Sequence, residues 1–105
     1  MTSGLDERLR EVERRMLREL PASLHSLCLL TSEWGEADDK LPQDLREEVA
    51  RLAHHIRGRA GMLQLVTLTE AAGALEQLCS GMPDATAVRD AALRCSAAFP
   101  NALNH

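Results

Sequence analysis

The sequence predicts an all-α protein, an antiparallel up-and-down four-helix bundle with an additional N-terminal helix. Apolar residues recur at intervals of three and four in every long segment, which is the spacing of an amphipathic helix. Of the 105 residues 45% are hydrophobic, yet only Trp34 and Phe99 are aromatic, so the core must consist of small and aliphatic side chains that suit close helix packing. Short connections between the predicted helices favour antiparallel neighbours.

The first predicted helix spans residues 5–20, where apolar residues alternate with five arginines. Pro21 interrupts this pattern and is well placed to be the first residue of a second helix. That second helix should end near Trp34-Gly35, because residues 35–40 are acidic, contain glycine and are typical of a solvated loop.

Pro42 can open the third and longest predicted helix, which runs to about Leu63. A turn is expected near Gln64. Thr67 followed three residues later by Glu70 has the spacing of a capping box, which would begin a fourth helix that continues to Cys79.

Gly81-Met82-Pro83 should end the fourth helix, and Asp84 is a plausible cap for the last one. Phe99-Pro100 is expected to stop that helix. The whole chain, residues 1–105, is then a single domain with a core over about 5–99 and a frayed tail at 100–105.

Composition excludes several classes of function. The net charge is −4 with acidic and basic residues interspersed, so the chain lacks the basic patch that nucleic-acid binding requires. No apolar run approaches 18 residues and no signal segment follows the polar start, which predicts a soluble cytoplasmic protein without a membrane partner. A bundle that buries its own apolar stripes is expected to be a monomer.

The sulfur-containing residues are expected to be structural. The chain has three cysteines, which are widely spaced on apolar stretches: Cys28, Cys79 and Cys95. We expect them to be small core residues in a reducing compartment, and we expect neither disulfides nor a zinc site. Three methionines are expected to fill the core or its cap: Met16, Met62 and Met82.

The helix expected at residues 42–63 carries the most informative pattern. Its apolar residues fall on one stripe, and His54 lies about 165° from the centre of that stripe, so it should point to solvent. Gly58 and Gly61 lie within about 40° of His54 on the same wheel. Each glycine inside a helix costs about 1 kcal/mol relative to alanine. An exposed imidazole on a face bared by two glycines indicates that another molecule comes close to it.

Simpler interpretations of these residues exist. His54 could be an ordinary solvent-facing histidine, and Arg57 and Arg59 could belong to a solvated charged face. His55, about 95° off the stripe, is better explained as a rim or packing residue than as a nucleophile. A metal site at His54 and His55 is disfavoured, because adjacent helical residues point about 100° apart and no third ligand is placed to join them.

The segment Ala53-His54-x-Ile56-Arg57-Gly58, with Gly61 following, resembles the phosphorylation motif of histidine phosphotransfer (HPt) domains. The resemblance covers roughly residues 9–99. Upstream, Leu20-Pro21-x-x-Leu24-x-x-Leu27 looks like the family's break between its first two helices. Downstream, apolar residues and a glutamate stand where the next helix of the family has an apolar pattern and a Glu or Gln: Leu65, Leu68 and Leu75-Glu76.

The resemblance implies a phosphorelay carrier. His54 would accept a phosphoryl group on Nε2 from a receiver-domain aspartate and pass it to another receiver, Arg57 would neutralise the phosphate, and Glu76 would orient the imidazole. Receiver domains of response regulators and hybrid sensor kinases would be the partners. They would dock on the face formed by His55, Gly58, Arg59 and Gly61.

No cofactor is expected on this chain. Mg²⁺ would sit on the partner receiver, and no ATP-dependent kinase activity is expected, because the sequence has neither a Gly-rich ATP-binding segment nor the pattern of a histidine kinase. Two positions depart from the family pattern, since Arg59 replaces a small residue and Gln64 stands where many members have glycine. Two alternatives remain open: a helical adaptor that binds a receiver or kinase without phosphotransfer, and a generic dimerising bundle.

Overall fold

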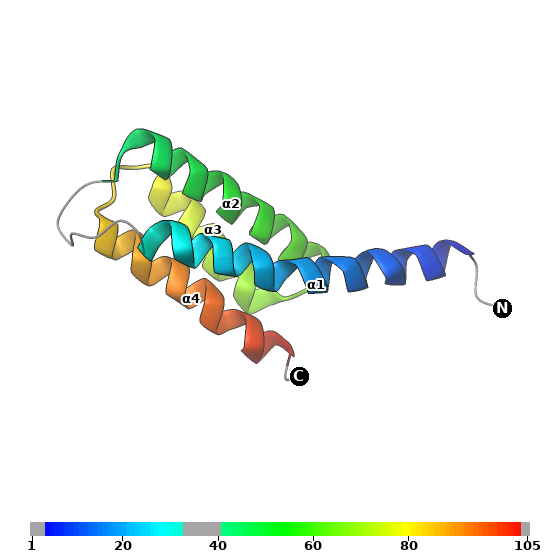
Figure 1. Ribbon diagram of the computed structural model, residues 1–105. Coiled ribbons are helices and arrows are strands. Elements are labelled where there is room, and N and C mark those ends of the chain that lie inside the picture. Colours follow the sequence, from blue (N-terminus) through cyan, green and yellow to red (C-terminus); the bar gives the residue numbers. More distant parts are fainter. Residues whose placement is uncertain (1–3, 33–40, 104–105) are drawn as a thin grey trace.

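The computed structural model describes residues 4–32 and 41–103, with side chains up to residue 99. This part of the chain forms four helices and no strand: α1 (Gly4–Ser32), α2 (Gln43–Met62), α3 (Val66–Cys79) and α4 (Ala85–Leu103). Successive helices run in opposite directions, as Figure 1 shows. The predicted all-α, up-and-down four-helix architecture is therefore confirmed.

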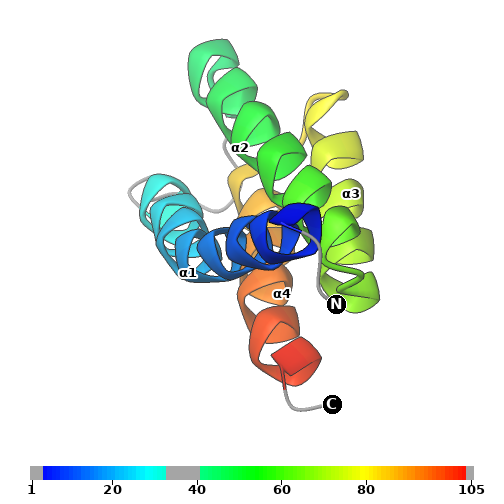
Figure 2. The same ribbon diagram turned by 90° about the vertical axis from the view of Figure 1, so that its right-hand side faces the viewer.

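The helices form a ring in chain order. α1 contacts α2 and α4, and α3 contacts the same two helices, so α1 and α3 lie on one diagonal of the bundle and α2 and α4 on the other. Figure 2 shows this arrangement end-on. Consequently the groove between α2 and α3 lies on the opposite side of the molecule from the groove between α1 and α4.

The core consists of aliphatic and small side chains, as the composition predicts. Its largest fully buried members come from every helix: Leu20, Leu27, Val49, Ile56, Leu68, Leu75, Val88 and Cys95. Alanines fill the space where helices approach closely, among them Ala53, Ala60, Ala72 and Ala92. Burying each large aliphatic side chain contributes about 1.5–3 kcal/mol, so this interior supplies the main driving force for folding.

The predicted break at Pro21 is wrong, because α1 is one continuous helix in which Pro21 is an interior residue. A proline at such a position removes one backbone hydrogen bond and costs about 3 kcal/mol. Leu20 precedes the proline and Leu24 and Leu27 follow it, and all three are buried on the same side of the helix while Pro21 is exposed. Packing of this shared stripe outweighs the local cost, so the additional N-terminal helix is not a separate element.

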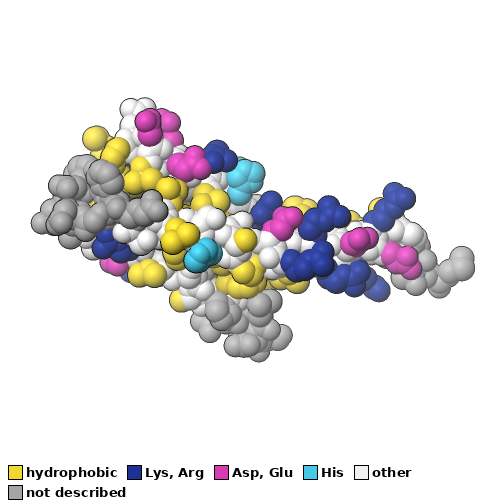
Figure 3. Space-filling model, in the orientation of Figure 1, with side chains coloured by type: hydrophobic (Ala, Val, Ile, Leu, Met, Phe, Trp, Pro, Cys, Tyr) yellow, Lys and Arg dark blue, Asp and Glu magenta, His cyan; other side chains and the backbone are white. Residues whose placement is uncertain are grey.

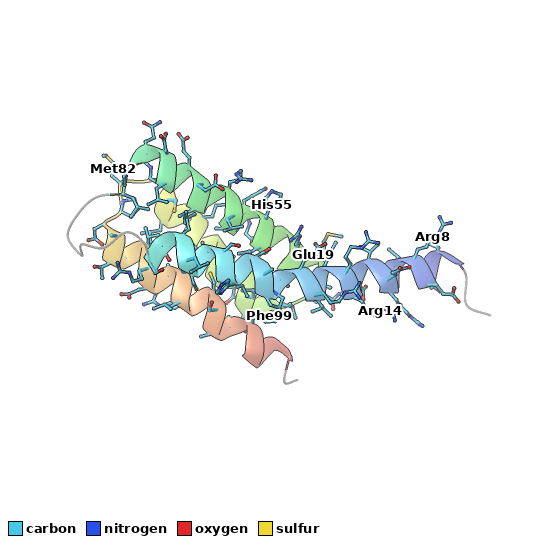
Figure 4. The ribbon with its side chains drawn as sticks, in the orientation of Figure 1. Arg8, Arg14, Glu19, His55, Met82 and Phe99 are labelled. Atoms are coloured by element: carbon cyan, nitrogen blue, oxygen red, sulfur yellow. The ribbon has the colours of Figure 1, made fainter. Side chains whose placement is uncertain are left out.

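The first half of α1 extends beyond the bundle (Figure 1). All side chains of residues 4–15 are exposed, Leu5 at 66% and Leu9 at 52%, and Leu20 is the first buried residue of the described part of α1. Figure 3 shows that basic and acidic side chains alternate along this extension, and in Figure 4 Arg8 and Arg14 project from it in different directions. The extension gives the molecule a long axis of 58 Å against 25 and 19 Å for the other two.

Two of the predicted helix starts are confirmed. Pro42 is the N-cap of α2, and its carbonyl accepts a hydrogen bond from the Arg46 amide. Asp84 caps α4 through a hydrogen bond from the Ala87 amide to its Oδ1, at 2.8 Å. The predicted end near Trp34-Gly35 and the loop at 35–40 lie outside the described residues.

Other predicted boundaries are wrong. Thr67 is not a cap, since α3 begins at Val66 with Leu65 at the N-cap and no capping side chain. The predicted turn near Gln64 is confirmed, and the φ of 59° at this residue is the one positive φ of a non-glycine residue in the described chain. α4 continues through Pro100 to Leu103 and does not stop at Phe99-Pro100.

The methionines and the cysteines differ in how far they are buried. Met62 and Met82 are exposed at 66% and 70%, so their predicted role as core filler is wrong, whereas Cys79 and Cys95 are buried as predicted and Cys28 is half-buried. Within the described ranges, none of the helices combines the length and apolar character needed to span a lipid bilayer.

Candidate functional site

His54 lies on the outer face of α2, as its helical position predicts. The buried residues of this helix occupy the opposite face: Val49, Ala53, Ile56 and Ala60. The His54 side chain is 63% exposed. Because the backbone hydrogen bonds of the helix hold the Cα atom, the position of the imidazole depends only on two side-chain torsions and on its neighbours.

Glu76 on α3 is the neighbour that orients this imidazole. Its Oε2 lies 2.9 Å from Nδ1 of His54. An ionised carboxylate can only accept a hydrogen bond, so the proton of the neutral imidazole lies on Nδ1, which donates to Glu76. The tautomer that results carries a lone pair on Nε2, the ring nitrogen that this hydrogen bond leaves free.

Arg57 reaches the same carboxylate from the other side. Its Nε lies 3.2 Å from Oε1 of Glu76, while Oε2 is the atom beside His54. Oε1 is buried and accepts no hydrogen bond from the described residues, so the adjacent guanidinium is what compensates its charge. His54, Glu76 and Arg57 thus form a single linked group across the groove between α2 and α3.

Three helical glycines lie on α2 and α3 near this group, and they differ in the space around them. A Cβ atom built on Gly58 or on Gly61 meets nothing within 4 Å, so both positions are bare surface and neither serves helix packing. A Cβ atom on Gly73 of α3 would lie 3.4 Å from Cδ of Arg57. Gly73 therefore marks the place where the arginine side chain crosses α3.

The sequence profile of the Hpt domain family matches residues 5–105, essentially the whole chain. The chain belongs to the Hpt domain family. The function of this family is histidine phosphotransfer in two-component signalling. No curated protein and no solved structure matches the chain significantly.

In this Hpt domain the two other basic or aromatic candidates on α2 lie to the side of the linked group. His55 is exposed, and Figure 4 shows it on α2 at a different angle around the helix from the groove with α3. Arg59 turns away toward α1, where its Nη2 lies 3.3 Å from Oε2 of Glu19 and its Nη1 donates to the hydroxyl of Ser23 at 3.4 Å. Arg59 thus connects α2 to α1 close to the point where α1 leaves the bundle.

The Hpt domain also has a shallow hollow at the end of the α2–α3 groove, which the sequence patterns did not reveal. It has a volume of about 610 Å³ and is lined by Gly61, Gln64, Val66, Thr69 and Glu70. Val66 and the neighbouring Met62 expose most of their side chains, at 64% and 66%. The hollow adds apolar surface to the face that carries Gly58 and Gly61. The signal that could have found it is the pair of apolar residues on either side of the turn at Gln64.

The described residues contain no cluster of three or more His, Cys, Asp or Glu side chains that could hold a metal ion. The linked group itself offers one imidazole and one carboxylate, and the carboxylate is already paired with Arg57. The group therefore brings an oriented imidazole next to a guanidinium.

Proposed function

We propose that this Hpt domain is a phosphorelay carrier that accepts a phosphoryl group on Nε2 of His54 from the phosphoaspartate of one receiver domain and passes it to the aspartate of another. The observation that carries the proposal is the 2.9 Å contact between Nδ1 of His54 and Oε2 of Glu76. This contact selects the tautomer with its lone pair on Nε2, in an imidazole that is exposed on the helix face bared by Gly58 and Gly61.

In the accepting step, the lone pair of Nε2 attacks the phosphorus of the receiver's acyl phosphate. The Nε2–P bond forms while the P–O bond to the aspartate breaks, and the aspartate carboxylate leaves with the bonding electron pair. The imidazole keeps its Nδ1 proton and becomes a phosphorylated imidazolium. Its positive charge is stabilised by the hydrogen bond to the Glu76 carboxylate.

The donating step is the reverse reaction with a second receiver. A carboxylate oxygen of that receiver's aspartate attacks the phosphorus, the Nε2–P bond breaks, and the ring returns to the neutral tautomer. A cationic ring is a better leaving group than a neutral one, so the contact with Glu76 assists both directions. Positioning and charge compensation are the main requirements of phosphoryl transfer, and this small site supplies the first of them.

The docking face in this proposal consists of Gly58, Gly61 and the hollow that follows them, with His55 and Arg59 at its edges. The two glycines let the receiver backbone come within contact distance of the imidazole. Val66 and Met62 supply exposed apolar area of the kind that marks a protein-interaction surface. Mg²⁺ belongs to the receiver in this scheme, and the carrier is expected to be a cytoplasmic monomer.

The test is phosphoryl transfer from a panel of pre-phosphorylated receiver domains to the wild-type chain, to His54→Gln and to His55→Gln. His55→Gln separates the nucleophile from its neighbour, because His55 is an exposed histidine on the same helix with no contact to Glu76. As a residue at the edge of the docking face it can change the rate of transfer, but its loss should not prevent labelling. We expect acid-labile, base-stable phosphate on the wild type and on His55→Gln, and none on His54→Gln.

Receivers that bind the wild-type chain without transferring phosphate would overturn the carrier function and leave the adaptor. Label that persists in His54→Gln and disappears in His55→Gln would assign the wrong nucleophile. Loss of self-association on substitution of exposed apolar residues, with no effect of His54→Gln on any property, would instead support a dimerising bundle.

A further inference from the structure

We propose that Arg57 is a positioning residue that acts on His54 through Glu76, and that the small size of the residue at position 73 leaves open the path that Arg57 follows. This role is separate from the neutralisation of phosphate that the family resemblance implies for Arg57. It concerns the unphosphorylated protein, so it can be tested even if the proposed function fails.

The first argument is the way the two oxygens of Glu76 are divided. Oε2 faces Nδ1 of His54 at 2.9 Å, and Oε1 faces Nε of Arg57 at 3.2 Å. A carboxylate is planar, so a contact that fixes Oε1 also fixes the direction in which Oε2 points. Arg57 therefore determines where Glu76 holds the imidazole, although it does not touch His54.

The second argument is burial. Oε1 of Glu76 is buried and accepts no hydrogen bond from the described residues, although the Glu76 side chain as a whole is 28% exposed. A buried carboxylate oxygen without compensation is unfavourable. Without the guanidinium, the carboxylate would rotate toward water and its hydrogen bond with His54 would weaken.

The third argument is the path that Arg57 follows. Its Cδ lies where it would be 3.4 Å from a Cβ on Gly73, three residues before Glu76 on the same helix. Residues three apart on a helix are neighbours on one face, so a side chain at position 73 would stand directly beside Glu76. A methyl group there would just touch the arginine. A longer side chain would occupy its path.

The fourth argument is the chemistry of arginine. The contact with Glu76 uses Nε, and no ion pair of the described residues uses the two terminal nitrogens of Arg57. The guanidinium has five N–H donors in a fixed plane, so it can hold Glu76 with one edge and offer another edge to a phosphoryl group. A lysine at this position would have a single nitrogen and could not divide its contacts in this way.

The experiment measures the tautomer of His54 in the unphosphorylated full-length chain labelled with ¹⁵N, using long-range ¹H–¹⁵N spectra under conditions where the ring is neutral. In Arg57→Gln we expect the ratio of the Nδ1–H to the Nε2–H tautomer to fall by up to about fivefold, since a partly exposed ion pair contributes at most about 1 kcal/mol. Arg57→Lys should keep most of the wild-type tautomer ratio, because its ammonium can pair with Oε1 of Glu76 when no phosphate competes.

Gly73→Leu should reproduce the tautomer shift of Arg57→Gln, and the two substitutions combined should shift it no further than either alone. Gly73→Ala should fold and change the ratio little. Arg51→Gln is the matched control, because Arg51 is an exposed arginine of α2 whose partner is Glu48 on the same helix.

A tautomer ratio in Arg57→Gln equal to that of the wild type would overturn the proposal whatever the Gly73 variants do. An additive shift in the double variant would overturn the part assigned to Gly73. If Gly73→Leu does not fold, a ratio in Gly73→Val that equals the wild type would overturn that part instead. Transfer assays decide the proposed function separately. If Arg57→Gln shows the expected tautomer shift but the wild-type chain accepts no phosphoryl group, Arg57 is a positioning residue of an adaptor.

Discussion

Replacing Gly58 by alanine should make the protein more stable, although Gly58 lies in the family's most characteristic motif. Gly58 is an interior residue of α2 with an ordinary helical φ, and a Cβ atom at this position meets nothing within 4 Å. The substitution therefore adds no clash and removes the backbone entropy cost of glycine. Helix propensities put the gain at about 1 kcal/mol.

This gain can be converted into a melting temperature. Unfolding entropy near 60 °C is about 2.1 cal/mol/K per residue, which gives about 0.2 kcal/mol/K for 105 residues. A gain of about 1 kcal/mol then raises Tm by about 4–5 °C. Gly61 should gain less, because it is the penultimate residue of α2, where helix propensity counts for less. Thermal unfolding followed by far-ultraviolet circular dichroism measures both values. An unchanged or lower Tm in Gly58→Ala would refute the reasoning that this face of α2 is bare.

The same position links stability to the proposed function. Gly58→Leu should fold, since the space around the residue is open, but it should reduce phosphoryl acceptance because the side chain lies where the receiver must approach. Ala97→Leu is the control: Ala97 is an exposed small residue on α4, a helix that does not contact α2. Undiminished acceptance in Gly58→Leu would show that the glycine is not retained for close approach.

Two other predictions concern the rest of the fold. Burial, with a smaller contribution from the Cys28 thiol, raises the pKa of Cys95 from 9.0 to about 11, so the folded state retains a proton that the unfolded chain loses. The free energy of unfolding should therefore be unaffected below pH 9, and Cys95 should lower it by about 2–3 kcal/mol as the pH rises through 11. Burial also raises the pKa of Cys79, so urea unfolding of Cys95→Ala should retain a shallower fall, and a fall as steep as that of the wild type would contradict the prediction. Deletion of residues 4–15 should lower the helical signal in circular dichroism but leave Tm within about 2 °C of the intact chain, because no side chain in this segment is buried. A large fall in Tm would show that the extension of α1 unfolds cooperatively with the bundle.

Periodicity explains why most of the architecture could be predicted from the sequence. The direction in which His54 points follows from the apolar stripe of its own helix. The caps at Pro42 and Asp84 could be predicted for a similar reason, because a cap depends only on residues within one turn. Pro21 shows the limit of such local rules. Its effect on the chain depends on Leu24 and Leu27 packing against other helices, and no rule about the proline itself contains that information.

The connections between side chains were less accessible. The sequence indicated Arg57 and Glu76 separately, each through its relation to His54, and gave no sign that they contact one another. That contact joins α2 to α3 beside Gly73, so it is a property of how the two helices pack. The contacts of Arg59 were missed in the same way. Its position on the helix suggested the docking face, and nothing in the sequence indicated that its guanidinium contacts Glu19 and Ser23 of α1.

The position of Arg59 changes the charge balance of the site. With Arg59 paired to α1, the linked group consists of the imidazole, one carboxylate and one guanidinium. In the tautomer that the proposed function uses, the formal charges of this group cancel before any phosphate arrives. A phosphoryl group brings about two negative charges, and Arg57 meets it with a charge already shared with Glu76. Under the proposed function, most of the charge compensation must therefore come from the receiver, where Mg²⁺ is expected. The contribution of the proposed carrier would then be the orientation of the His54 imidazole by Glu76 and an accessible face at Gly58 and Gly61.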